Sequence, residues 1–351
     1  MYPRLEINLT KIQHNAYVIV DMCAKLGIEI TGVTKVALGI PAVARALVAG
    51  GVTSLGDSRL ANIMRMHEAG IHQTMWLLRS PALSEVEAVV EHVDVSLNSE
   101  FTVLLALSRA ATRQRKEHQV ILMADLGDLR EGVRPKELAR LWLQAGALPG
   151  IKLLGFGTNF ACGNGVLPAS DNMTQFVRLK KDLAVRAPLL SAGNSSALHL
   201  MRQGYWQGAW VSQVNHLRIG ESIFLGWDII DQTPLDGCYT DACMLQAEVI
   251  EVQEKTSIER GRHRRGLLAL GKQDLGAGRL EPVCQKIEIL GSSSDHMILD
   301  LGQEDITVGD VCQFRVDYGA LLGLFTSPYV KKTFSGQDNL LPNRGLYDII
   351  V

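Results

Sequence analysis

The sequence predicts an α/β fold, a TIM (β/α)8 barrel followed by a smaller, mostly β C-terminal domain. Short apolar runs alternate with amphipathic helical stretches, as in a parallel sheet covered by helices. Eight such units fit into roughly 220 residues, close to the size of a TIM barrel. After Trp227 this alternation stops, and strand-like runs separated by turn residues take over.

The elements of the barrel follow one another regularly. Thr10 is placed to cap the first helix, IEITGVTK forms the first strand, and Pro41 opens the next helix. An open, doubly wound sheet is the main alternative, but no G-x-G-x-x-G follows the first strand. Seven further apolar runs complete the barrel, and each except the last precedes a helical pattern: TSLGDS, TMWLLRS, VDVSLN, VILMADLG, IKLLGFGTN, PLLSAGN and QVNHLRIG.

We expect the barrel to span residues 10–227 and the β-rich domain to span residues 228–351, with residues 1–9 completing the latter. The strand-like runs of the second domain are MLQAEVIEVQEKT, RGLLALG, KIEILGSSSDHMILDLG and DVCQFRVDYGALLGLF. With 47% hydrophobic residues in a chain of 351, both units have material for a core.

Charge and cysteine content narrow the function. A net charge of -2 with mixed signs argues against binding nucleic acid or an anionic membrane. The basic run ERGRHRR, residues 259–265, is expected to be a solvated loop. Six cysteines without a C-x-x-C pair predict reduced thiols and no metal site. With no signal-peptide pattern and no apolar run near the ~20 residues of a membrane span, we expect a cytoplasmic protein.

Polar residues stand where the predicted strands end, and this rim of a TIM barrel holds the active site. Lys35 ends the first strand and Asn159 the sixth. Asp57, Arg79 and Asn98 end the second to fourth strands, and each of these taken alone is an ordinary strand cap. Together, the polar residues predict a site at the rim.

Two loops of this rim are suited to an anion. AGNSSALHL places Asn194, Ser195 and Ser196 at a helix N-terminus, although N-capping alone would also select these residues. LRIGES offers the backbone N–H groups of Gly220 and Glu221 beside Arg218. A phosphorylated ligand is therefore predicted. The sequence lacks G-x-x-x-x-G-K-[ST], so a nucleoside triphosphate is not indicated.

Lys35 lies in the apolar stretch EITGVTKVALG and has two interpretations. It is either a structural lysine that extends to the rim, or an amine used as a nucleophile. A neutral amine attacks a carbonyl to give a Schiff base. With a phosphate cradle at the same barrel mouth, the second interpretation points to pyridoxal phosphate, a phosphorylated aldehyde.

Over almost its whole length the chain resembles the alanine racemase superfamily, the fold-type III pyridoxal-phosphate enzymes. RLEINLTKIQHN is similar to the family's EIDLDALRHN, and VTKVALG to the VVKANAYG that carries its lysine. ADLGDLREGV resembles IDTGMGRLG, GFGTNF resembles THF, and AGNSSA resembles ANSAA. LRIGESIFLG resembles VRPGIALYG, and LGSSSDHMILDL resembles GRVCMDQLMVDL.

The resemblance implies a pyridoxal-phosphate-dependent amino-acid racemase. Lys35 would hold the cofactor as an internal aldimine and act as base on one face. Arg218 would face the pyridine nitrogen, which then stays unprotonated because a guanidinium does not give up its proton. Arg130 would lie near the phenolic oxygen, and Asn159 and Asn194 would also line the cofactor site. The residues implied around the phosphate are Ser195, Ser196, Gly220, Glu221 and Tyr318.

The departures place the chain nearest the ornithine and broad-specificity amino-acid racemase branch. Alanine racemases have a phosphate-contacting tyrosine where Gly39 stands, and a stacking histidine where Asn159 stands. Their opposite-face base is a tyrosine of the partner subunit, and residues 257–265 contain none. The resemblance also implies a homodimer with shared active sites, in which each β domain completes the neighbouring barrel.

Several assignments stay open at this point. Asp295 is the best-placed second base, and a basic substrate would need a carboxylate at the far end of the pocket. A decarboxylase or aldolase on the same scaffold, or a non-catalytic cofactor carrier, are alternative functions. The rivals to Asp295 are His216, His263 and Tyr329, and the candidate distal carboxylates are Asp128, Glu131 and Asp274.

Overall fold

The fold is described from a computed structural model, which covers residues 1–161, 165–182, 187–257 and 261–336. Eight parallel strands close into a barrel, as the sequence predicts. The barrel closes where β2 pairs with β9, with Glu29 opposite His216. In chain order the barrel strands are β2 (Glu29–Val33), β3 (Ser54–Asp57), β4 (Thr74–Leu77), β5 (Val95–Asn98), β6 (His118–Met123), β7 (Ile151–Thr158), β8 (Leu189–Ala192) and β9 (His216–Ile219).

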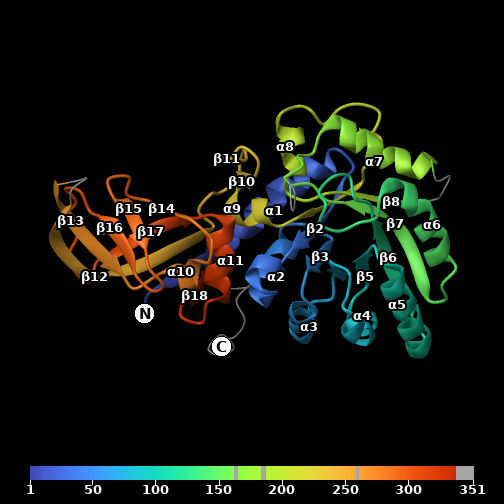
Figure 1. The fold of residues 1–351 in the computed structure, drawn as a ribbon, viewed down its shortest axis with the longest axis horizontal. Helices are drawn as coiled ribbons and strands as arrows, with labels where there is room; N and C mark the ends of the chain where they lie inside the picture. Colours follow the sequence, from blue (N-terminus) through green and yellow to red (C-terminus); the bar gives the residue numbers. More distant parts are fainter. Residues whose placement is uncertain (162–164, 183–186, 258–260, 337–351) are drawn as a thin grey trace.

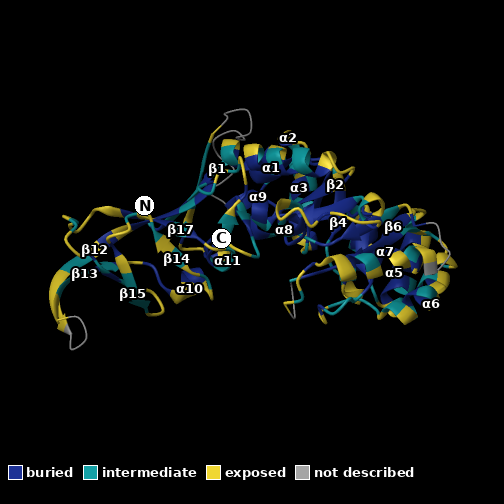
Figure 2. Cartoon of the chain, turned by 90° about the horizontal axis from the view of Figure 1, so that it is seen from above, coloured by how far each residue is buried: buried dark blue, intermediate teal, exposed yellow. Residues whose placement is uncertain are grey.

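Helices cover the outside of the barrel (Figure 1). Their apolar faces pack on the strands, and their exposed faces form the outer surface (Figure 2). The first helix is capped by Asn8 rather than the predicted Thr10, because the Asn8 side chain accepts from the backbone N–H of Lys11. The helices are α1 (Leu9–Ala24), α2 (Pro41–Ala49), α3 (Leu60–Glu68), α4 (Val86–His92), α5 (Phe101–Gln114), α6 (Pro135–Gly146), α7 (Ser170–Asp182), α8 (Ala197–Arg202) and α9 (Glu221–Leu225). Short 3-10 turns are η1 (Lys35–Ala37), η2 (Leu83–Glu85) and η3 (Val211–Gln213).

Side chains fill the barrel interior. Trp76 of β4 stacks on His216 of β9, with the ring centroids 4.5 Å apart. Because β4 and β9 are not neighbours in the barrel, this contact crosses its interior. The barrel is thus a packed core, and the chemistry is confined to its rim.

A mostly β unit follows the barrel and lies beside it (Figure 1). The strand β1 (Arg4–Asn8) joins this unit by pairing with both β12 and β18. We retain residues 10–227 and 228–351 as the proposed limits of the two domains; residues 337–351 lie outside the described part. The elements of the second unit are β10 (Trp227–Asp228), β11 (Thr233–Pro234), β12 (Cys243–Ser257), β13 (Gly261–Leu268), α10 (Lys272–Leu275), β14 (Leu280–Pro282), β15 (Glu288–Ser292), β16 (Met297–Asp300), β17 (Val311–Val316), α11 (Tyr318–Thr326) and β18 (Lys331–Ser335).

Two local predictions were wrong. The basic run was expected to be a loop, but Gly261 onwards forms strand β13, antiparallel to β12. Arg264 in this strand donates to the backbone oxygens of Glu304 and Ile306, so the charges have local partners; Glu259 and Arg260 lie outside the described residues. Also, β9 is followed by the short helix α9, where no helix was expected.

In the described part of the chain, no helix has both the length and the apolar character needed to cross a membrane.

Candidate active site

A cavity of about 610 Å³ opens at the carboxyl ends of the barrel strands. Of the predicted cofactor-binding residues, all except Ser196 line it: Lys35, Arg130, Asn159, Asn194, Ser195, Arg218, Gly220, Glu221 and Tyr318. Most of these come from strand ends and the loops that follow them, while Tyr318 comes from α11 of the second unit. The site is therefore built by the barrel and the C-terminal unit together.

Lys35 is half-buried and begins the turn η1, two residues beyond the end of β2 at Val33. Its ammonium nitrogen lies 5.6 Å from the centre of the Tyr318 ring. Within the described ranges, no hydrogen bond or ion pair engages this nitrogen from another side chain. Lys35 thus has its amine at the cavity wall, held by the turn rather than by the strand.

Asp57 secures this turn. Its Oδ2 accepts from Thr34 Oγ1 at 2.8 Å, and its Oδ1 accepts from Asn62 Nδ2 at 2.9 Å. Burial raises the pKa of the Asp57 carboxyl, while the hydrogen bonds from Thr34 and Asn62 act against that rise. Asp57 is fully buried and does not line the cavity, so it fixes the residue before Lys35 instead of meeting a ligand.

The turn also explains the glycine at position 39. Leu38 and Gly39 have φ angles of 53° and 64°, in the left-handed region. A Cβ on Gly39 would lie 2.6 Å from the backbone oxygen of Asn62. A larger side chain does not fit there, which explains the glycine at the position where the resemblance implies a tyrosine.

Arg218 is a buried cation held by three residues from two neighbouring strands of the barrel. Its Nη2 donates to Thr158 O and Asn159 Oδ1, both at 2.7 Å. Its Nη1 donates to the backbone oxygen of Ser191 at 3.3 Å and to the Ser191 hydroxyl. The guanidinium is thereby fixed in position by β7 and β8 before any ligand arrives.

His216, a rival candidate for the second base, is a core histidine. Its Nε2 lies 2.9 Å from Thr31 Oγ1 and its Nδ1 lies 2.8 Å from Ser191 Oγ, so both ring nitrogens are hydrogen-bonded. Burial lowers the pKa of His216 to about 3, and the charge of Arg218 adds to this effect. The ring is neutral, does not line the cavity and serves the packing of the barrel.

A chain of hydrogen bonds runs along the rim from Arg218 to Arg130. Asn159 accepts from Arg218 and donates from its Nδ2 to Glu131 Oε1 at 2.7 Å. The same Glu131 oxygen accepts from Arg130 Nη2 at 2.6 Å. The loop that carries Arg130 is closed by Asp125, whose Oδ1 accepts from the backbone N–H of Gly127 at 2.9 Å. Asn159 and Glu131 thus couple the two arginines.

The turns after β8 and β9 contain unsatisfied hydroxyl groups. Among the described residues, Ser196 Oγ and Ser222 Oγ are buried and have no hydrogen-bond partner. Ser195 Oγ accepts from the backbone N–H of Ser222 at 3.3 Å, which brings the two turns together. A Cβ on Gly220 would lie 2.8 Å from Val33 Cβ, so only glycine allows this close approach. An anion with several oxygen atoms, such as a phosphate, fits these donors.

The candidates in the C-terminal unit lie outside the cavity of their own chain. Asp295 is exposed, and its Oδ1 lies 3.1 Å from His296 Nδ1. His263 lies on β13, and Tyr329 is 67% exposed. Asp274 is buried and accepts from Ser327 Oγ at 2.7 Å, which makes it part of the local packing. Asp128, a candidate distal carboxylate in the barrel, is also buried and is not among the residues that line the cavity.

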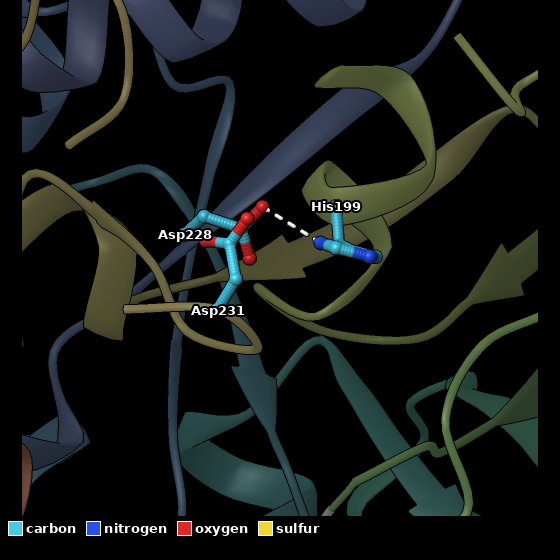
Figure 3. Close-up of side chains that lie close together, drawn as sticks. All are labelled: His199, Asp228 and Asp231. Atoms are coloured by element: carbon cyan, nitrogen blue, oxygen red, sulfur yellow. Dashed lines mark hydrogen bonds and ion pairs between the residues drawn. The ribbon is translucent and has the colours of Figure 1, made fainter. Parts of the chain in front are cut away.

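One group of side chains has the composition of a metal site, but it is an ion-pair cluster. His199, Asp228 and Asp231 lie close together, with His199 Nδ1 2.9 Å from Asp228 Oδ2 (Figure 3). Arg202 Nη1 lies 2.9 Å from Asp231 Oδ2 and 3.6 Å from Asp228 Oδ2. The guanidinium of Arg202 supplies the positive charge that the two carboxylates need. The cluster therefore joins α8 to the segment after the barrel through ion pairs.

Comparison with known proteins shows the family to which the chain belongs. The sequence matches the family described as "Alanine racemase, N-terminal domain" over residues 7–226. The chain belongs to the alanine racemase family. It is 37% identical to a lysine racemase of Thermotoga maritima and 34% identical to an ornithine racemase of Acetoanaerobium sticklandii. Each alignment covers 95% of this chain and 99% of the relative.

A solved structure shows the same fold. Alanine racemase from a D-cycloserine-producing Streptomyces lavendulae superposes with a TM-score of 0.73 at 18% identity, over 96% of this chain and 98% of that chain. The predicted barrel with a mostly β C-terminal domain is thus confirmed. As an alanine racemase family member, the chain uses pyridoxal 5'-phosphate, and the hydroxyls and glycine described above fit its phosphate.

Sequence reasoning missed some contributors to this site. Ser191 and Thr158 hold Arg218, yet both stand inside apolar strands that gave no polar signal. Ser222 directly follows the glycine and glutamate of LRIGES, and this position next to the predicted anion-binding loop is a signal by which the sequence could have indicated its role. Arg79, interpreted as a strand cap, lines the cavity two residues beyond the end of β4.

Proposed function

We propose that the protein interconverts the L and D forms of an amino acid and that its preferred substrates are basic amino acids. The observation that supports racemisation most strongly is Lys35 at the wall of the cavity that the turns after β8 and β9 also line, in a chain of the alanine racemase family. Basic substrates are supported by the full-length similarity to a lysine racemase and an ornithine racemase.

The cofactor, when bound, withdraws electrons from the amino acid and makes its Cα proton acidic. Lys35 would hold the cofactor through its aldehyde, and its Nζ would remove or return the Cα proton on one face. Arg218 would face the pyridine nitrogen of the cofactor. Because a guanidinium does not release a proton, that nitrogen would stay unprotonated. Arg130, oriented by Glu131 and Asn159, would bind the substrate carboxylate. Inversion needs a second proton donor on the other face.

Two alternative functions receive less support. A decarboxylase or an aldolase shares the scaffold, but both full-length relatives named above are racemases. A non-catalytic cofactor carrier needs only a barrel, whereas here the C-terminal unit supplies Tyr318 to the cavity. Racemisation is therefore the function that the observations favour.

A direct assay tests this proposal. Purified protein is incubated in deuterated water with single enantiomers of lysine, ornithine and alanine, and the products are separated by chiral chromatography. We expect deuterium at Cα together with inversion, and faster turnover of lysine and ornithine than of alanine. Carbon dioxide release would indicate decarboxylation instead, and label uptake without inversion would contradict racemisation.

We also propose a homodimer with shared active sites, in which Asp295 of one subunit serves the cavity of the other. Asp295 is exposed and does not line its own cavity, so a role in catalysis requires a second copy. A cytoplasmic location is proposed as well, supported by the free thiols of the five described cysteines.

Mixing two inactive variants tests the shared site. Lys35→Ala and Asp295→Ala chains are each expected to be inactive, while their mixture regains about a quarter of the wild-type activity, because half of the statistical dimers hold one intact site. Native mass spectrometry verifies that mixed dimers form. If they form and activity stays at background, the sites are not shared; if Asp295→Ala alone is active, Asp295 is not the second base.

A further inference from the structure

Cations dominate the wall of the active-site cavity. Lys35, Arg79, Arg130 and Arg218 line it, against two carboxylates, Glu131 and Glu221. If the substrate is a basic amino acid, as proposed above, its distal ammonium group enters this cavity with its charge. An ammonium is costly to remove from water unless it meets an anion, and the cations repel it. Within this cavity, the described residues offer two carboxylates for that ammonium group.

Glu131 is already occupied. Its Oε1 accepts from Arg130 Nη2 at 2.6 Å and from Asn159 Nδ2 at 2.7 Å, and its Oε2 contacts Arg130 Nε. A carboxylate that serves a neighbouring guanidinium through both oxygens has little negative potential left for a further cation. Glu131 also belongs to the chain of hydrogen bonds that leads to Arg218, so it serves the part of the site that every substrate would share.

Glu221 is different. It is half-buried at the start of α9, and in the described part of the chain no other residue forms a hydrogen bond or ion pair with its carboxylate. Burial raises the pKa of Glu221 to about 7; the positive charge of Lys35 acts against this rise, and Asp317 adds to it. The Glu221 carboxylate thus responds to a nearby cation and has none bound to it directly.

Glu221 also stands between two cavities. A second cavity, of about 570 Å³, shares Glu221, Ile229 and Tyr318 with the first. Its wall combines the apolar side chains Leu225, Trp227 and Val316 with charged ones, the carboxylates Asp228, Glu281 and Asp317 and the cations Arg279 and Arg315. An aliphatic chain that leaves the reaction centre in this direction can therefore contact apolar surface while its charged end stays near Glu221.

We propose that Glu221 binds the distal ammonium group of the substrate and thereby selects basic amino acids. This inference rests on the proposed function, because it assigns the side-chain subsite of the same active site.

The first test compares lysine with norleucine, which has a methyl group in place of the distal ammonium group. Glu221→Gln is expected to lower kcat/KM for lysine about 10- to 100-fold, mainly through KM, because a hydrogen bond to a charged group is lost. In the same variant, kcat/KM for norleucine should stay the same or rise. Glu131→Gln is the matched control, expected to lower both values together and leave their ratio unchanged.

A second test needs no turnover. The reduced, stable conjugates of the cofactor with lysine and with norleucine are titrated into cofactor-free protein by calorimetry. Wild-type protein should prefer the lysine conjugate, and the preference should increase in Lys35→Ala, which removes the competing ammonium, and disappear in Glu221→Gln. Both conjugates contain the same cofactor, so its contribution to the binding free energy cancels when the two affinities are compared.

The outcomes separate the two proposals. Wild-type protein that racemises lysine while Glu221→Gln keeps the lysine to norleucine ratio in both assays overturns the role of Glu221 alone. An equal loss for both substrates also overturns it, since Glu221 would then act on the cofactor or on Lys35. Wild-type protein that racemises only uncharged amino acids overturns the basic substrate itself, and the Glu221 subsite with it.

Discussion

Lys35→Ala is expected to lower the rate of racemisation by about 10³-fold or more and to abolish the visible absorption band of the bound cofactor. Among the described residues that line the cavity, Lys35 is the only lysine, and its amine is placed both to bind the aldehyde and to exchange the Cα proton, so a single change removes two functions. Chiral chromatography measures the rate, and the absorption spectrum of the purified protein measures covalent binding of the cofactor.

Lys152→Ala is a suitable control for this prediction. Lys152 is exposed and pairs with Glu117 at 3.3 Å on the far side of the barrel strands, at the start of β7. An exposed pair of this kind contributes little to stability, so activity and spectrum should stay at the wild-type level. Retention of the absorption band in Lys35→Ala would show that another amine holds the cofactor.

Arg218→Ala is expected to lower the free energy of unfolding by about 2–4 kcal/mol, because it leaves buried acceptors on Ser191, Thr158 and Asn159 without their donor. Urea unfolding followed by circular dichroism measures the loss. Activity should fall as well, since Asn159 also orients Glu131 and, through it, Arg130.

Arg79→Ala provides the comparison. Arg79 lines the same cavity, but it is only half-buried and forms no hydrogen bond or ion pair with the described residues, so its loss should change the free energy of unfolding by less than about 1 kcal/mol. Equal destabilisation by the two variants would mean that the contacts of Arg218 do not stabilise the barrel, contrary to our interpretation.

Much of the architecture could be predicted from the sequence, because hydrophobic periodicity reports burial directly. Eight apolar runs indicate eight barrel strands, and the polar residues at their ends indicate the rim. The exact ends were harder to predict. Lys35 was placed on its strand, but strand pairing stops at Val33 and a 3-10 turn begins at Lys35. Where pairing stops depends on the neighbouring strands, and one segment alone carries no signal of that.

The basic run 259–265 shows a second limit. Consecutive like charges favour a solvated loop when only their own segment is considered. In the fold, Arg262 of β13 contacts Glu254 of β12, and Arg264 reaches backbone oxygens near β16. These partners come from other parts of the chain. The second base could not be identified from the sequence of one segment for a similar reason, because the proposed shared site needs residues from another subunit.

The turn at Gly39 and the helix α3 constrain each other. Its neighbour Asn62 holds Asp57 through its side chain and blocks position 39 through its backbone oxygen. A single mutation to tyrosine at position 39 therefore produces a clash, and relieving it requires α3 to move together with the carboxylate that fixes the lysine. The glycine at position 39 and the position of α3 therefore depend on each other, and a tyrosine at position 39 fits this fold only together with a shift of that helix.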